Sequence, residues 1–292
     1  MEGRGLPARL PPLPRLNAPA QANMRITTWN INSVRLRIGL VLRFLAEHRP
    51  DVLCLQEIKC LNDQFPRKAF EAAGYGHVAV HGQKGYHGVA TVARTPFEAL
   101  GSTQFCGMDD CRHVATRHSL PGLGGIAVHN FYVPAGGDEP DPAVNDKFAH
   151  KLAFMEEMTA MFAGLRDEPA VIVGDLNVAP HEHDVWSSRQ LRRVVSHTPV
   201  EREAMAGMVA AGGMVDVARA LAPADEKLFT WWSYRAKDWR ASNRGRRLDH
   251  VWVTRALADR ALAGGRDALR VHEDARGWEK PSDHAPVTLD LA

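Results

Sequence analysis

Hydrophobic positions along the chain recur with two periods, one typical of strands and one typical of helices. The segment RITTWNIN at 25–32 alternates between two faces, as a strand does. Helical spacing marks residues 146–165 and 200–211. Further apolar runs of strand length cover 52–55, 77–81, 88–93, 113–118, 125–133, 170–174, 248–254 and 285–291. Many short strands with helices between them predict an α/β protein in which two mixed sheets pack face to face and are flanked by helices.

Two helix starts carry local capping signals. Thr198 and Glu201 form a capping box around Pro199, which predicts the start of the helix at 200–211. Ser33 precedes apolar residues at helical spacing and predicts a helix that begins there and ends before Pro50. The apolar positions of that helix are Leu36, Leu40, Val41, Phe44 and Leu45.

The first 23 residues differ from the rest of the chain in composition. They are rich in Pro, Arg and Ala, show no hydrophobic periodicity and contain five prolines, which break helices. A targeting peptide is one interpretation, because the segment is rich in Arg and poor in acids. We favour a disordered tail at 1–23, or an upstream start codon with Met24 as the working start, followed by a single domain at 24–292.

Charge and cysteine content limit the classes of function only weakly. The 36 Lys and Arg residues against 34 Asp and Glu residues leave a net charge of +2, which is low for a nucleic-acid binder, so local charge must decide. No apolar run is long enough to cross a bilayer, and no membrane partner is expected. The four cysteines contain no CxxC pair, so free thiols in a reducing, cytoplasmic compartment are expected and a zinc site is not.

Polar residues gather at the ends of five predicted strands. A single Asp or Asn at a strand end is usually a turn former. Five such ends at one rim would instead collect uncompensated charge that requires a cation, and Glu, Asp and Asn oxygens suit Mg²⁺ or Mn²⁺. With an Asp–His pair, the cluster indicates metal-assisted phosphoryl transfer. The residues are Asn30 and Asn32, Glu57, Asp175 and Asn177, Asp249 and His250, and Asp283 and His284.

Several motifs in this region and beyond it match a known family. From Met24 to its end the chain resembles the exonuclease III / apurinic-apyrimidinic (AP) endonuclease family, within the endonuclease–exonuclease–phosphatase superfamily. WNIN, LQEIK, GDLN, LDHVWV and SDHAP mark the superfamily, and HGQKGYHGVA, NFYVP, FTWWSYR, NRGRRLDH and KPSDHAP resemble its bacterial DNA-repair branch. The resemblance implies a DNase I-like four-layer α/β sandwich for residues 24–292.

The resemblance also implies roles at the catalytic centre. Glu57, helped by Asn32, would bind the divalent metal. Asp175 would orient or deprotonate the attacking water, and Asn30 and Asn177 would hold that network. The implied metal-binding set is Glu57, Asn32, Asp175, Asn177, Asp283 and His284.

Further contacts to the scissile phosphate follow from the same resemblance. His284 would contact a phosphate oxygen, and Asp249 would fix the tautomer of its ring. Tyr132 would place a phenol against the same phosphate. The implied reaction incises duplex DNA 5′ to abasic sites, trims blocked 3′ ends and degrades duplexes from the 3′ end, leaving 3′-hydroxyl and 5′-phosphate groups.

DNA contacts are implied for residues in the motif loops. Trp231 would line a pocket for an extruded abasic sugar. Flipping this sugar out of the duplex costs little free energy, because it has no base to unstack or unpair. The neighbouring Trp232 is better explained as a core residue. The expected phosphate contacts are Lys59, Lys84, Arg112, Asn243, Arg244 and Arg247, although loop Lys and Arg residues are often only solvated surface.

The sequence leaves several alternative functions open. After Tyr132-Val133-Pro134 the chain has Ala135, where relatives often have Gln or Asn, so the balance of endonuclease and exonuclease activity is open. Another phosphodiesterase or phosphatase of the superfamily would share the chemistry, and a non-catalytic DNA-binding protein is a second alternative. His181-Glu182-His183-Asp184 lacks the helical spacing of a metal site. A monomer is the default expectation.

Overall fold

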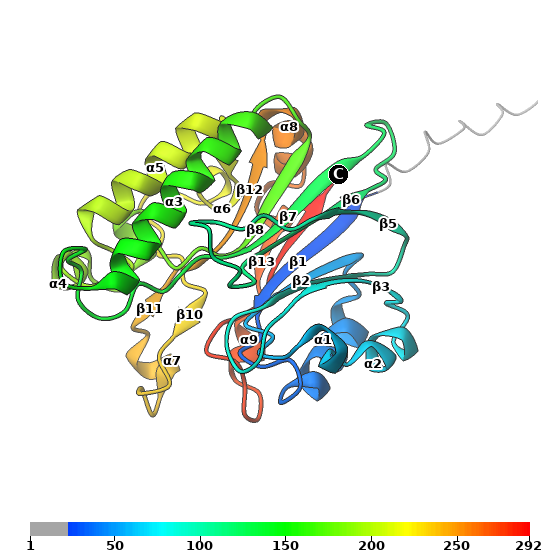
Figure 1. Ribbon diagram of the computed structural model, residues 1–292, viewed down its shortest axis with the longest axis horizontal. Helices are drawn as coiled ribbons and strands as arrows, with labels where there is room; N and C mark the ends of the chain where they lie inside the picture. The colour runs from blue at the N-terminus through cyan, green and yellow to red at the C-terminus, as the bar shows by residue number, and fades with distance from the viewer. Residues whose placement is uncertain (1–22) are drawn as a thin grey trace, which may run out of the picture.

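Two six-stranded mixed sheets form the centre of the protein and lie face to face (Figure 1). The computed structural model describes residues 23–292, so the tail expected at 1–23 lies outside the described residues except for Asn23. The strand orders are β13-β14-β1-β2-β4-β3 and β5-β6-β7-β8-β12-β9. Within the described range, no helix combines the length and apolar character needed to cross a membrane.

The first sheet is antiparallel except for one central pair. Its strands are β1 (Met24–Asn30), β2 (Val52–Gln56), β3 (His77–His81), β4 (Val89–Ala93), β13 (Leu269–Val271) and β14 (Val287–Leu291). β1 and β2 run parallel, while β14 pairs antiparallel with β1 on its other side. The carboxyl ends of β1 and β2 and the amino end of β14 therefore meet at one edge.

The second sheet repeats this arrangement. Its strands are β5 (Phe97–Gly101), β6 (His113–His118), β7 (Ile126–Tyr132), β8 (Ala170–Asp175), β9 (Met214–Asp216) and β12 (Asp249–Thr254). β7 and β8 are parallel, and β12 is antiparallel to β8. A separate ribbon of β10 (Trp231–Trp232) and β11 (Gly245–Arg246) projects beside this edge (Figure 1).

Helices cover the outer face of each sheet and complete four layers. α1 (Ile38–His48) and α2 (Arg67–Ala72) pack on the first sheet, and α3 (Asp146–Leu165) and α5 (Pro199–Gly212) pack together on the second (Figure 1). The shorter helices are α4 (Ser188–Leu191), α6 (Val217–Leu221), α7 (Trp239–Ser242), α8 (Ala258–Leu262) and α9 (Glu273–Arg276). The predicted sandwich is confirmed.

The largest core lies between the two sheets. Ile26 and Cys54 of the first sheet pack with Val171 and Val251 of the second, and none of these side chains is exposed. Removing this apolar surface from water supplies the main driving force for joining the sheets. The core therefore holds in register the two sheet edges that carry the polar strand ends.

The predicted helix starts had different outcomes. The Thr198–Glu201 capping box is present at the start of α5. The prediction that Ser33 begins a helix is wrong: α1 begins at Ile38, and Ser33 has a φ of 84°. Its backbone N–H donates to the Glu57 carbonyl, so the residue belongs to a turn that joins two site loops, and Leu36 is 68% exposed. An N-cap needs extended backbone angles, which this turn does not allow.

Candidate active site

Strand topology brings the predicted polar residues to one edge of the sandwich. Tyr132 ends β7 and Asp175 ends β8, and the two are register partners. Asp249 begins the antiparallel β12 opposite Asp175. Asn30 ends β1, and His284 lies just before β14. Residues from both sheets thus converge because parallel strands end, and antiparallel strands begin, at the same place.

Asp175 occupies the centre of this edge. It is 1% exposed and accepts a hydrogen bond from Asn30 Nδ2 at 2.9 Å. The backbone N–H of Asn177 donates to its Oδ1 at 3.0 Å, and Asn177 Nδ2 lies 3.2 Å from its Oδ2. Gly174 precedes it with a φ of 142°, and a Cβ there would lie 1.9 Å from the Phe131 carbonyl oxygen. Only glycine allows this close approach, so Gly174 fixes where the carboxylate points.

His284 is oriented by one carboxylate and faces another. Its Nδ1 donates to Asp249 Oδ2 at 2.8 Å, and its Nε2 lies 3.7 Å from Asp175 Oδ2. Burial alone would lower the pKa of His284, but the charges of Asp249 and Asp175 and the hydrogen bond to Asp249 raise it well above its ordinary value. Burial raises the pKa of Asp175. His284 therefore presents an Nε2–H donor to the space in front of Asp175.

Glu57 links the two sheets. It accepts hydrogen bonds from Asn30 Nδ2 and from the Tyr132 hydroxyl, each at 2.9 Å. Burial opposes its charge, but the neighbouring Lys59 ammonium and the Asn30 hydrogen bond hold its pKa below the ordinary value. Burial and the charges of Glu57 and Asp175 raise the pKa of Tyr132 well above its ordinary value. The phenol therefore remains a donor at neutral pH.

A cation already bridges two of the predicted metal ligands. Lys59 Nζ lies 2.8 Å from Glu57 Oε2 and 2.7 Å from Asn32 Oδ1. Asn32 Nδ2 in turn donates to Asp283 Oδ1 at 3.2 Å. Oxygen atoms of an acid and an amide that hold an ammonium also suit a hard divalent ion.

The charge balance of the edge supports a divalent ion as well. Glu57 is ion-paired with Lys59, and Asp175 and Asp249 both lie beside His284. Asp283, the fourth carboxylate of this edge, forms no ion pair among the described residues. Buried charges need compensation because they have lost their hydration. The residues present therefore fit a divalent metal.

The predicted DNA-binding residues do not all lie on the same surface. This edge opens into a cleft of about 670 Å³, which Trp231 and Arg244 line together with Asp175 and His284. Arg244 is exposed, with its guanidinium 4.7 Å from the Trp186 ring centroid. Lys84 and Asn243 are also exposed, in the β3–β4 loop and after α7. Lys84 and Arg244 are exposed enough to reach a phosphate, whereas Asn243 Oδ1 already accepts a hydrogen bond from Trp232 Nε1 at 3.1 Å.

Two predicted phosphate contacts are engaged inside the protein. Arg247 is 1% exposed, and its guanidinium forms ion pairs with Asp184 at 2.8 Å and Asp216 at 2.8 Å. The prediction of a DNA contact from Arg247 is therefore wrong. Arg112 is 7% exposed, ion-paired with Asp110 and 5.0 Å from the Tyr132 ring centroid, so the structure gives it a supporting position beneath the phenol instead.

The basic run RGRR divides because Arg246, the last residue of β11, and Arg247, which follows that strand, point to opposite sides. Arg247 points into the interior, whereas Arg246 lines the cleft. The Arg246 guanidinium donates to Ser196 Oγ at 2.8 Å and lies 5.3 Å from the Trp231 ring centroid. Sequence reasoning missed Arg246 as a site residue, although period-2 alternation would have separated it from Arg247. Trp232 is 1% exposed, which confirms its core assignment.

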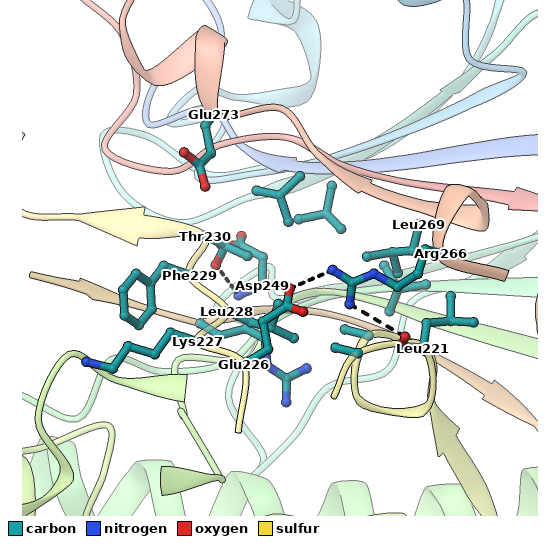
Figure 2. Close-up of a pocket in the computed structure, with 16 residues that line it drawn as sticks. Leu221, Glu226, Lys227, Leu228, Phe229, Thr230, Asp249, Arg266, Leu269 and Glu273 are labelled. Atoms are coloured by element: carbon teal, nitrogen blue, oxygen red, sulfur yellow. Dashed lines mark hydrogen bonds and ion pairs between the residues drawn. The ribbon is translucent and has the colours of Figure 1, made fainter. Parts of the chain in front are cut away.

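A second cavity of about 230 Å³ lies on another side of Asp249 (Figure 2). Leu221, Leu228 and Leu269 supply apolar walls, and Arg266 pairs with Glu226 at 2.6 Å. Asp249 lines this cavity, and its Oδ1 has no hydrogen-bond partner among the described residues. Among the described residues, the Asp249 carboxylate is therefore held only by its hydrogen bond with His284.

Comparisons with known proteins identify the family of this chain. Residues 27–284 match the Endonuclease/Exonuclease/phosphatase family. Exodeoxyribonuclease III of Haemophilus influenzae is 32% identical over 277 residues, which cover 92% of this chain and all of that protein. An AP endonuclease from Archaeoglobus fulgidus has a similar structure, with a TM-score of 0.81 and 33% identity over 92% of this chain and 99% of that one.

A DNA-bound relative is also similar. The 3′ phosphatase NExo from Neisseria, solved with a product DNA hairpin, has a TM-score of 0.79 and is 30% identical, covering 92% of this chain and 99% of that chain. Together with the full-length match to exodeoxyribonuclease III, these similarities decide the assignment. The chain is a hydrolase of the nuclease class and belongs to the exonuclease III / AP endonuclease family within the Endonuclease/Exonuclease/phosphatase family.

Proposed function

We propose that this nuclease is a Mg²⁺-dependent DNA repair phosphodiesterase, with Mn²⁺ as an alternative ion. It incises duplex DNA 5′ to abasic sites, removes blocked 3′ ends and degrades duplexes from the 3′ end. The observation that carries the proposal is the pairing of Asp175 with His284 across 3.7 Å, inside a cleft that an exposed arginine and a tryptophan line. The names of the similar proteins support DNA as the substrate.

The proposed reaction begins with the water held by Asp175. Asn30 and Asn177 fix both carboxylate oxygens, so the base cannot rotate away from the cleft. Burial raises the pKa of Asp175 toward neutrality, which suits a group that must accept a proton from water. The activated water attacks phosphorus in line, and the 3′ oxygen departs on the opposite side.

Donors on the other side of the cleft bind the phosphate. His284 Nε2–H donates to a non-bridging oxygen, while Asp249 fixes its ring. The protonated Tyr132 phenol donates its one hydrogen to Glu57 Oε1 in this structure, and it would turn that hydrogen to the same phosphate when DNA binds. Positioned donors of this kind stabilise the charge that develops in the transition state.

Glu57 and Asn32 would hold the metal, with Asp283 next to Asn32. When bound, the ion polarises the phosphate and stabilises the departing oxygen. Its binding requires Lys59 to move from its present position between the two oxygens. Lys59 therefore competes for the metal site in this arrangement.

Duplex DNA would bind across the mouth of the cleft. Lys84, Asn243 and Arg244 contact the backbone, and Trp231 lines the pocket for the extruded abasic sugar. Trp231 is held by a hydrogen bond from its Nε1 to Asp283 Oδ2 at 2.9 Å. We further propose a monomer that acts on chromosomal DNA in the cytoplasm.

The test uses an end-labelled duplex with one abasic site and an undamaged blunt duplex. Each is incubated with Mg²⁺ or EDTA and with wild type, Asp175→Ala or Asp167→Ala. Asp167 is the matched control because it is exposed before the opposite end of β8. We expect Mg²⁺-dependent cleavage 5′ to the lesion, which Asp175→Ala abolishes and Asp167→Ala retains.

Other outcomes separate the alternatives. Shortening of both duplexes from the 3′ end without incision would make the protein mainly an exonuclease, with the same chemistry. Cleavage of neither duplex would contradict the DNA assignment and favour another phosphodiester or phosphate substrate. Binding without cleavage in any metal would indicate a non-catalytic DNA-binding protein.

A further inference from the structure

A second group of metal-binding side chains lies at the end of β3, outside the catalytic cleft. His81, Asp109 and Cys111 each offer one ligand atom, and these atoms all lie within 4.8 Å of one another. His81 is the last residue of β3, and the other two belong to the segment that leads into β6. The three therefore come together only through packing of the two sheets.

The hydrogen bonds of His81 leave one ring nitrogen available as a ligand. Its Nδ1 lies 3.1 Å from the His113 carbonyl oxygen, which can only accept, so Nδ1 carries the hydrogen. In the neutral ring, Nε2 then directs its lone pair at Asp109 Oδ1, 3.0 Å away. Two lone pairs in contact require either a second proton or a cation between them. A histidine fixed through a backbone carbonyl is the usual arrangement behind a metal ligand.

Cys111 supplies a third donor and defines the class of metal. It is 6% exposed and forms no disulfide. The neighbouring carboxylate of Asp110 is engaged elsewhere, because it pairs with Arg112 and accepts a hydrogen bond from His150 at 3.3 Å. A set of one imidazole, one thiolate and one carboxylate suits a borderline ion such as Zn²⁺, not Mg²⁺, which prefers oxygen alone.

The spacing fits tetrahedral coordination. Zn²⁺ bonds of about 2.0–2.3 Å place adjacent ligand atoms roughly 3.3–3.6 Å apart, so only small side-chain rotations are needed. The side chain of Asp109 is 62% exposed, which leaves the fourth position open to water. From this arrangement we propose that His81, Asp109 and Cys111 form a binding site for Zn²⁺ or a similar thiophilic divalent ion, separate from the catalytic metal site.

Such an ion would tie the end of β3 to the segment before β6. That segment carries Arg112, whose guanidinium donates to the Tyr132 carbonyl at 3.3 Å. The proposed ligand Cys111 is therefore next in sequence to Arg112, which contacts Tyr132. Its role is structural, because none of its ligands lines the catalytic cleft.

The test uses Co²⁺ as a spectroscopic probe with the full chain in excess Mg²⁺. Metal is first removed with a chelator, and Co²⁺ is then titrated while the thiolate-to-metal charge-transfer band is recorded. Cys111→Ser removes the thiolate, and His81→Gln and Asp109→Asn remove the other ligands. Cys106→Ser is the matched control because Cys106 lies in the same segment and is partly buried.

We expect one equivalent of Co²⁺ to produce the band in wild type and Cys106→Ser. Cys111→Ser should lose the band, and His81→Gln should weaken Zn²⁺ binding in calorimetry by at least about tenfold, since even outer partners contribute roughly 10–100-fold. Zn²⁺ should raise the Tm of wild type but not of His81→Gln, which keeps the test valid if Cys111→Ser folds poorly. Absence of the band in wild type, or its persistence in Cys111→Ser, would overturn the proposal in favour of a simple imidazolium–carboxylate pair.

Discussion

The imidazole of His284 and the carboxylate of Asp249 are joined by a hydrogen bond of 2.8 Å between Nδ1 and Oδ2. Both side chains are almost completely buried. The other Asp249 oxygen has no partner among the described residues, so this bond is the carboxylate's main anchor. Orientation of His284, the proposed donor to the phosphate, therefore depends on one contact between β12 and the segment before β14.

Asp249→Asn tests that dependence. The amide would turn its nitrogen or a weaker acceptor toward Nδ1, favouring the wrong tautomer of His284 and removing the charge that keeps it protonated. We expect kcat for abasic-site incision to fall by about 10²- to 10⁴-fold, with little change in DNA affinity. The exposed Asp259→Asn on α8 serves as the control. A fall in kcat of less than about threefold would show that Asp249 does not orient the ring.

Lys59→Met tests competition between a side chain and the metal. The Lys59 ammonium lies between Glu57 and Asn32 oxygens, so its removal should free them. We expect the half-saturating Mg²⁺ concentration to fall by about fivefold, equivalent to roughly 1 kcal/mol for a partly exposed ion pair. The measurement is incision rate against Mg²⁺ concentration, with Lys68→Met on the exposed face of α2 as control. An unchanged Mg²⁺ requirement with weaker DNA binding would instead assign Lys59 to a phosphate.

Arg244→Ala and Arg247→Ala separate a surface arginine from a buried one. Arg244 is exposed at the cleft, so its loss should weaken DNA binding and reduce the slope of log affinity against log salt by about one. Arg247 compensates Asp184 and Asp216, so its loss should lower the free energy of unfolding by about 3–5 kcal/mol. Fluorescence anisotropy across a salt series and urea unfolding measure the two effects. The assignment of Arg247 to the interior would be contradicted if Arg247→Ala lost as much DNA affinity as Arg244→Ala and kept the wild-type free energy of unfolding.

Buried histidines make stability depend on mildly acidic pH. Burial lowers the pKa of His118 and His129 to about 4 and that of His250 and His272 to about 3. Between pH 6.5 and 5 these histidines therefore become protonated in the unfolded chain but stay neutral in the folded chain. Stability falls as pH falls, by up to about 1.4 kcal/mol per pH unit for each such proton.

Urea unfolding from pH 7 to pH 5 measures this slope. His118→Gln should reduce it by the contribution of one proton, because its Nδ1 is buried without a partner. The control is His183→Gln, a partly buried position after β8. If both variants keep the wild-type slope, protonation of His118 does not drive the acid sensitivity.

Local patterns in the sequence determined the elements and the kind of chemistry. The strand at His77–His81 and the helix at Asp146–Leu165 were predicted to the residue, and the Thr198 capping box begins α5 as expected. Alternation and capping act over a few neighbouring residues, so they can be read without a fold. The polar strand ends also indicated a shared edge, because strand direction decides where such ends meet.

Tertiary structure alone decided which partner each side chain has. Arg247 binds Asp184 and Asp216, which are 63 and 31 residues away in sequence, so a basic run that looked like a DNA contact is interior. Lys59 likewise lies between the side chains of Asn32 and Glu57. Ser33 forms a turn whose backbone N–H donates to the Glu57 carbonyl. No local pattern encodes these contacts, because each depends on the distance between chain segments after packing.

The group of His81, Asp109 and Cys111 is a further case of long-range contacts that no local sequence pattern predicts. Cysteine spacing predicted no zinc site, and within the sequence His81 lies far from Cys111. Packing of β3 beside the segment before β6 brings their ligand atoms within 4.8 Å. Sequence therefore determined the residue types of the proposed catalytic site and their order along the strands. Only the folded chain decided which charges are exposed, buried or shared, because burial and ion pairing are properties of three-dimensional proximity.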